Sequence, residues 1–194
     1  SARINRRSSA RKAYFKKEWR QLFRTPVYFL NCALMTFIWP VIFAVPIAFS
    51  LMGSREDLDM AGVGMEEVQM LFSGDLAQGI IMLSVFGVTA FICTCSMASS
   101  TAVSREGKSY YFMKYIPVPY EIQVRAKTDL GIVIDLLGTM PYILIAGAAG
   151  VIWLGISPAA VALSLVICGL TVVMANYLQI MVDLTKPKLC WENE

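Results

Sequence analysis

The chain has 194 residues, of which 57% are hydrophobic and only 16% are charged, and its formal net charge is +3. Soluble domains have about 45–50% apolar and about 25% charged residues. The distribution of charge, with no charged residue from 25 to 54 or from 76 to 104, excludes an ordinary soluble domain. The chain has no histidine and no G-x-x-x-x-G-K-[ST] phosphate loop, which excludes a His-based catalytic pair and ATP hydrolysis by the chain itself. We expect no enzymatic activity, no cofactor, no metal site and no nucleic-acid partner.

The chain begins with a basic arm, residues 1–24, that carries nine of the 17 Lys and Arg residues. Within this arm, residues 11–24 predict an amphipathic helix that lies on the membrane surface, with apolar side chains on one face and basic ones on the other. The alternative is a mobile basic arm that only sets the membrane topology. Thr25-Pro26 should end the helix. The expected membrane anchors are Phe15, Trp19, Leu22 and Phe23.

The membrane domain is predicted over residues 25–182, because its long uncharged runs exceed the roughly 20 residues that a helix needs to cross a bilayer. The run from 136 to 182 is long enough for two spans. Gly155-Ile156-Ser157-Pro158 should form the turn between them, since Gly closes helices, Ser caps them and Pro suits their first position. The sequence therefore predicts an all-α, polytopic bundle with four spans at 27–52, 76–103, 130–155 and 159–182.

The distribution of basic residues predicts the orientation of the bundle. Sixteen Lys and Arg residues fall in the arm, in the loop 104–129 and in the tail 183–194, and one falls in the loop 53–75 beside six acidic residues. Because basic residues stay on the cytoplasmic side, both termini are expected there. We expect a multi-pass protein of the cell membrane, in contact with the lipid bilayer.

Few polar side chains interrupt the spans. Asp135 is the only ionisable carboxyl within a span, and such residues are functional candidates by default. It lies about 8 Å of helix rise after Leu130, so we expect it at headgroup level and in contact with water. Asn176 and Gln179 are its expected hydrogen-bond partners. Cys93 and Cys95 are interpreted as small helix-packing residues.

The loop 104–129 is the most informative segment, with the sequence SREGKSYYFMKYIPVPYEIQVRAKTD. Residues 106–115 predict a short helix with an aromatic surface, which Ile116-Pro117-Val118-Pro119 should end. Residues 120–129 should begin the helix that continues into the third span. A short helix joined to a span can transmit motion from a soluble partner. The alternative is a structured loop that lies on the lipid headgroups.

Three segments, KKEWRQLFRTP (16–26), SREGKSYYFMKYIPVPYEIQVRAK (104–127) and DLTKPKLCWENE (183–194), resemble the permease subunits of bacterial type-2 ABC exporters. The likeness is to the subgroup whose permeases contain two such halves in tandem. The D-x-x-x-P-K-L-x-W-x-x-E pattern is its most specific part. That tail motif comprises Asp183, Pro187, Lys188, Leu189, Trp191 and Glu194.

The resemblance implies a membrane subunit that moves an unidentified substrate outward, using ATP that a separate cytoplasmic ABC ATPase hydrolyses. Residues 11–24 would be the elbow helix of the family, and the loop 104–129 would contact the ATPase. The implied coupling residues are Arg105, Glu106, Gly107, Lys108, Tyr111 and Tyr115.

Family halves have six spans, whereas this chain has four, so we expect a fragment that works with further permease helices or with a second copy. Two other function classes fit the same residues. An accessory or scaffolding membrane protein needs no transport pathway, and an ion-coupled transporter or channel would use Asp135.

Overall fold

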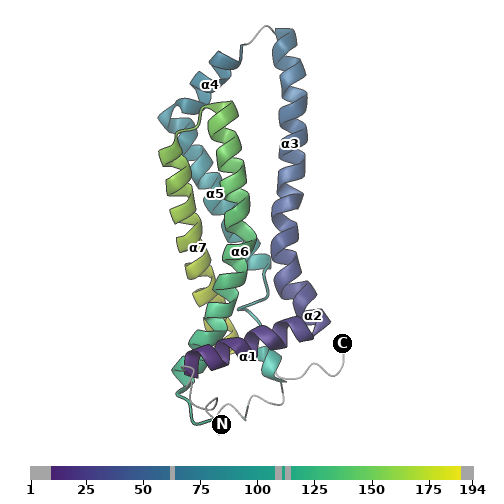
Figure 1. Ribbon diagram of the computed structural model, residues 1–194, viewed down its shortest axis with the longest axis vertical. Coiled ribbons are helices and arrows are strands. Elements are labelled where there is room, and N and C mark those ends of the chain that lie inside the picture. The colour runs from purple at the N-terminus through teal and green to yellow at the C-terminus, as the bar shows by residue number, and fades with distance from the viewer. Residues whose placement is uncertain (1–9, 62–63, 108–110, 112–114, 189–194) are drawn as a thin grey trace, which may run out of the picture.

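All regular structure in the described part of the chain is helical, as the sequence predicted (Figure 1). The computed structural model describes residues 10–61, 64–107, 111 and 115–188. Four helical stretches are long and apolar enough to cross a membrane: Pro26–Pro46, Asp75–Cys95, Tyr120–Leu154 and Pro158–Thr185. The chain is therefore an all-α, polytopic membrane protein.

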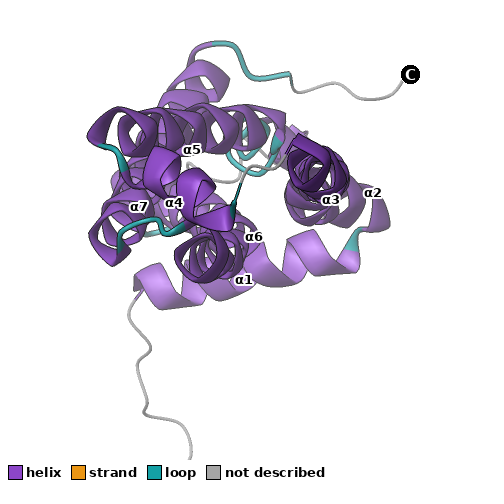
Figure 2. Ribbon diagram, turned by 90° about the horizontal axis from the view of Figure 1, so that it is seen from above, coloured by secondary structure: helices purple, strands orange, loops and turns teal. Residues whose placement is uncertain are grey.

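The helix α1 (Ala10–Arg24) lies across one end of the bundle, and the spans rise from it (Figures 1 and 2). It ends where predicted, because Thr25 is extended and Pro26 begins the next helix. The chain then continues through α2 (Pro26–Tyr28), a π-helical segment η1 (Phe29–Leu34) and α3 (Met35–Ala61). We call the end of the bundle that carries α1 the basic end.

The loop predicted at 53–75 is largely helical. The helix of the first span, α3, continues past the expected end at residue 52 to Ala61. A short helix, α4 (Met65–Ser73), follows. The second span is α5 (Asp75–Cys95). The third, α6 (Tyr120–Leu154), begins ten residues before the expected boundary at 130, as the reading of residues 120–129 predicted, and the fourth is α7 (Pro158–Thr185).

The turn between α6 and α7 forms as predicted. Gly155 adopts a left-handed conformation with φ of 67°, which glycine tolerates without a steric penalty. Ser157 caps α7, since its side chain accepts a hydrogen bond from the Ala160 N–H at 3.2 Å, and Pro158 occupies the first helical position.

The prediction that the second span extends to residue 103 is wrong. The helix α5 ends at Cys95, because the backbone of Ser96 is extended. Residues 96–103 then form an irregular segment with turns that lies within the basic end. Ala98, Ser99 and Ala102 are all buried there. These small side chains let the non-helical chain pass between the helices.

The helices α5, α6 and α7 pack together, while α3 stands beside α6 (Figure 1). Close approach depends on two glycines of α6. A Cβ on Gly131 would overlap the side chains of Ser99 and Asn176, and one on Gly138 would lie 3.1 Å from the Thr36 carbonyl oxygen. Small residues therefore bring polar side chains of three elements into contact with α6.

Candidate functional site

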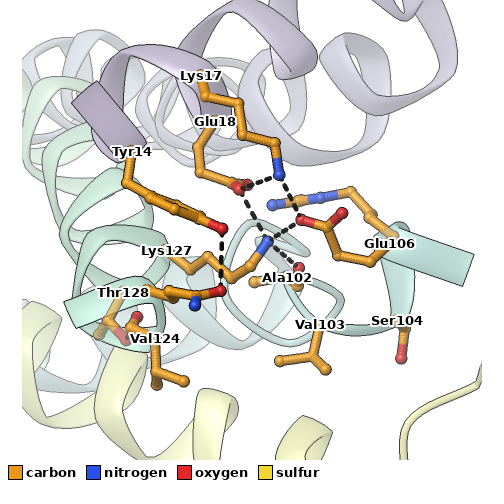
Figure 3. Close-up of polar contacts among 12 residues, drawn as sticks. Tyr14, Lys17, Glu18, Ala102, Val103, Ser104, Glu106, Val124, Lys127 and Thr128 are labelled. Carbon is orange, nitrogen blue, oxygen red and sulfur yellow. Dashed lines mark hydrogen bonds and ion pairs between the residues drawn. The ribbon is translucent and has the colours of Figure 1, made fainter. Parts of the chain in front are cut away.

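A buried ionic cluster joins α1, residues 102–106 and the start of α6 at the basic end (Figure 3). Its centre is Lys127, whose side chain is only 1% exposed. The ammonium donates to Glu106 Oε1 at 2.6 Å, to Glu18 Oε1 at 2.9 Å and to the Ala102 carbonyl oxygen at 3.0 Å. An ammonium has three N–H donors, so all of them are used.

The second cation of the cluster is Lys17, which is half exposed at the rim. Its Nζ lies 2.9 Å from Glu106 Oε1 and 3.5 Å from Glu18 Oε1. Two ammonium groups thus face two carboxylates, and the cluster is electrically balanced. A balanced group of buried charges avoids most of the penalty of an unpaired one. We call Lys17, Glu18, Glu106 and Lys127 the ionic cluster.

The four-residue spacing of α-helices places these groups. Tyr14, Glu18 and Leu22 lie on one buried face of α1. On α6, Gln123 and Lys127 are also four residues apart, and the Tyr14 hydroxyl donates to Gln123 Oε1 at 2.9 Å. The two helices therefore make two contacts about one helical turn apart, Tyr14 with Gln123 and Glu18 with Lys127.

The predicted membrane anchors of α1 contribute mainly to the protein interior. Leu22 is buried in a core cluster with Cys32, Ala33 and Leu130, and Phe15 and Trp19 pack against that cluster. Only Phe23 is substantially exposed. The face that the sequence analysis assigned to lipid thus largely packs against the bundle, and the burial of Tyr14 and Glu18 beside Leu22 was not predicted.

Two of the predicted coupling residues are buried and do not present a surface to a partner. Arg105 is 8% exposed, donates to Cys32 Sγ at 3.2 Å and stacks over the Tyr28 ring at 5.7 Å. The Glu106 side chain is 7% exposed within the ionic cluster. In this arrangement other residues of the chain already pair with both charges, and the prediction that they meet an ATPase stays a prediction.

The other predicted coupling residues fall into two groups. Tyr111 is 61% exposed and Tyr115 is 83% exposed, so both rings lie at the protein surface. Gly107 has φ of 51° and closes a single 3₁₀ turn over residues 104–107. Lys108 lies outside the described residues. Within the helix predicted over 106–115, Glu106, Gly107 and Tyr111 are 3₁₀-helical and Tyr115 lies in a turn, and the other six positions lie outside the described residues.

The tail motif begins inside the bundle. Asp183 belongs to α7, which extends to Thr185, so the predicted tail boundary at 183 is wrong. Its buried carboxylate accepts from the Val103 N–H at 2.6 Å, the Ser104 N–H at 3.1 Å and the Ser104 hydroxyl. The Lys188 N–H donates to Ser104 Oγ at 2.9 Å, which holds Pro187 beside the turn. Leu189, Trp191 and Glu194 lie outside the described residues.

A second polar site lies within the spans, around Asp135. This residue is fully buried, so the prediction of a water-exposed carboxyl at headgroup level is wrong. The predicted partner Asn176 does donate to it, at 2.7 Å, whereas the Gln179 amide donates to the Cys93 carbonyl instead. Residues 96–107 and α1 cover this end of α6, which excludes water from the carboxyl.

The ionic cluster also sets the charge of its members over a wide pH range. Burial alone would raise the pKa of Glu106, but the Lys127 and Lys17 ammonium groups outweigh it and hold that pKa below the ordinary value of 4.5. Burial alone would lower the pKa of Lys17, but Glu18 and Glu106 outweigh it and hold that pKa above 10.5. Glu106 and Lys17 therefore stay ionised near neutral pH.

These shifts predict how stability depends on pH. The contribution of Glu106 is fully present above pH 4.5 and is lost as the pH falls through its lowered pKa. The contribution of Lys17 is fully present below pH 10.5 and is lost as the pH rises through its raised pKa. Thermal unfolding between pH 3 and 7 should therefore be less steeply pH-dependent in Glu106→Gln than in the parent. Equal slopes in the two proteins would contradict this assignment.

The buried ion pairs of the basic end connect α1, α6 and residues 102–106, and Asp183 connects α7 to the same segment. This arrangement is better suited to holding helices together than to catalysing a reaction. The exposed aromatic rings are the groups that a partner could contact. No protein-family model, curated protein or solved structure matches this chain. The proposed function therefore rests on the contacts between residues of this chain.

Proposed function

We propose that this chain is a membrane-spanning permease component of an ATP-binding-cassette exporter, which moves its substrate outward with ATP hydrolysed by a separate subunit. One observation carries the proposal. The three segments that resemble type-2 exporter permeases are far apart in the sequence, yet they contact one another at the basic end. Glu18 comes from the first segment, Glu106 and Lys127 from the second, and Asp183 from the third.

The contacts also suit the transmission of force. Residues 102–107 are held on α6 by Lys127 and on α7 by Asp183, and Glu106 connects them to α1. A displacement of this loop would therefore move α1, α6 and α7 together. In an exporter, ATP binding and hydrolysis shift the balance between two arrangements of the spans.

The docking surface for the ATPase in this proposal is the exposed aromatic pair Tyr111 and Tyr115. Tyrosine is enriched among the residues that dominate protein–protein binding energy. The proposal places the basic end, and with it both termini, in the cytoplasm, in keeping with the positions of Lys and Arg.

Site-specific photocross-linking tests the proposed partner. A photoreactive phenylalanine analogue replaces Tyr115 in native membranes, and the adduct is identified by mass spectrometry. We expect a cytoplasmic protein that contains an ATP-binding cassette. The matched control places the same analogue at Glu66, which is exposed on α4 at the opposite end and should give no such adduct. Adducts with integral membrane proteins alone would favour the scaffolding alternative.

A further inference from the structure

The site around Asp135 is independent of the basic end and has features that the proposed export function does not use. Five elements contribute to it: α3 through Thr36, α5 through Cys93, residues 96–103 through Ser96 and Ser99, α6 through Asp135, and α7 through Asn176. All six of these side chains are buried. The site lies within the membrane-spanning part of the chain.

The hydrogen bonds to the Asp135 carboxyl come from uncharged side chains. Asn176 Nδ2 donates to Oδ2 at 2.7 Å, and its other N–H is directed to the Val172 carbonyl oxygen. The Thr36 hydroxyl lies 3.4 Å from Oδ1 and 3.2 Å from the Cys32 carbonyl oxygen, so its single proton is shared between them. The Ser96 hydroxyl and the Cys93 thiol also lie within hydrogen-bonding reach of this carboxyl.

Among the described residues, no cation contacts this carboxyl. The titratable neighbours are Cys93 from α5 and Cys168 from α7, which donates to Thr139. The helix α3 contributes only the Thr36 hydroxyl. At η1, the Cys32 sulfur receives its hydrogen bond from Arg105, whose other bond goes to Thr101. An ionised Asp135 would therefore be an unpaired charge within the bilayer.

Burying an unpaired charge costs far more than neutralising it, so a carboxyl in this setting takes up a cation or a proton. The described residues bring no group of three or more His, Cys, Asp or Glu side chains together that could hold a metal ion. The proton is the cation that this geometry accommodates.

The Ser96 hydroxyl provides a second observation. It is fully buried within hydrogen-bonding reach of the Asp135 carboxyl, but it makes no hydrogen bond of normal geometry to any described residue. A buried hydroxyl that lacks such a bond is costly. A protonated carboxyl can donate its O–H to the Ser96 oxygen, which an ionised carboxylate cannot do.

We propose that Asp135 is a proton-binding site within the membrane domain, neutral in this packed arrangement and donating its proton toward Ser96 Oγ. Loss of the proton would leave a carboxylate that needs water, which can enter only if α3, with Thr36, separates from α6. Proton binding and the packed arrangement of α3 against α6 would then stabilise each other. This inference does not rest on the proposed export function.

Infrared spectroscopy of the parent protein in lipid nanodiscs at pH 7 tests the proposal. We expect a carbonyl-stretch band of a protonated carboxylic acid that shifts when aspartate is labelled with ¹³C at the side-chain carboxyl. Asp135→Asn should remove the band, whereas the exposed control Asp75→Asn should leave it. Ser96→Ala should move it to higher frequency, because the O–H group loses its acceptor. Since labelling identifies the band in the parent protein, the test does not depend on Asp135→Asn folding.

Either of two results would overturn the proposal. The first is the absence of a ¹³C-sensitive acid band from the parent protein at pH 7. The second is a band that remains in a folded Asp135→Asn variant. A band that is identical in Ser96→Ala and in the parent would overturn the assignment of Ser96 as the acceptor.

Discussion

Replacing Lys127 with Met should destabilise the protein more than any other single change to the charges of the basic end. The substitution removes the ammonium that Glu18 and Glu106 share, and leaves two buried carboxylates with only Lys17 at the rim. Breaking a buried ion pair from one side costs about 3–5 kcal/mol in proteins. We expect a loss of this size in the free energy of unfolding, measured by denaturant or thermal unfolding in a defined detergent.

The matched control is Arg125→Met, two residues earlier on α6. Arg125 pairs with Glu121 at 2.6 Å, but both side chains are largely exposed. Exposed pairs contribute about 0–1 kcal/mol, so this variant should behave almost like the parent. Similar losses for the two variants would contradict the view that the ionic cluster is a buried structural junction. Neutralising Glu18 and Glu106 together with Lys127 should recover part of the stability, because the only charge left without its partners is Lys17, which is half exposed.

Replacing Asp183 with Ala should release the turn at 103–107 from α7. The change removes the acceptor of the Val103 N–H, the Ser104 N–H and the Ser104 hydroxyl, all of them buried. An unsatisfied buried donor costs about 1–3 kcal/mol, so we expect at least about 2 kcal/mol of destabilisation. Amide hydrogen exchange over residues 102–106 should become faster.

The middle of α6 provides an internal reference for that measurement, because its amides do not contact Asp183. Asp183→Asn retains one acceptor oxygen and should give an intermediate effect. The exposed neighbour Lys186→Ala should leave exchange at the turn unchanged. Faster exchange throughout the chain, with no preference for residues 102–106, would mean that Asp183 stabilises the whole bundle and does not hold this turn.

The spans and the turn between α6 and α7 were predictable because their signals are local. Uncharged runs of sufficient length mark the spans, and Gly155, Ser157 and Pro158 each act on the backbone next to them. The end of α5 was not predictable in this way. Residues 97–102 continue the uncharged run without a break, and only their packing against other elements shows that they leave the helix.

The ionic cluster was missed because counting Lys and Arg for topology treats each of them as solvated. Lys127 was counted as one more basic residue of an inner loop, yet its partner Glu18 lies 109 positions away, beyond the range of any helical periodicity. Asp135 was misjudged for a related reason. Its depth was estimated from a span that begins at Leu130, whereas α6 begins at Tyr120 and other elements cover its first turns.

The central claim is that the aromatic surface at the basic end couples this chain to an ATPase. The most direct measurement is ATP hydrolysis by the complex of this chain, in its native protein context, with the proposed ATP-binding-cassette subunit. We predict that Tyr111→Ala combined with Tyr115→Ala abolishes stimulation of hydrolysis by the membrane subunit, while membrane insertion and thermal stability stay close to those of the parent, since both rings are exposed. Glu66→Ala should leave stimulation unchanged. Full stimulation in the double variant, or no ATPase that co-purifies with the parent, would contradict the claim.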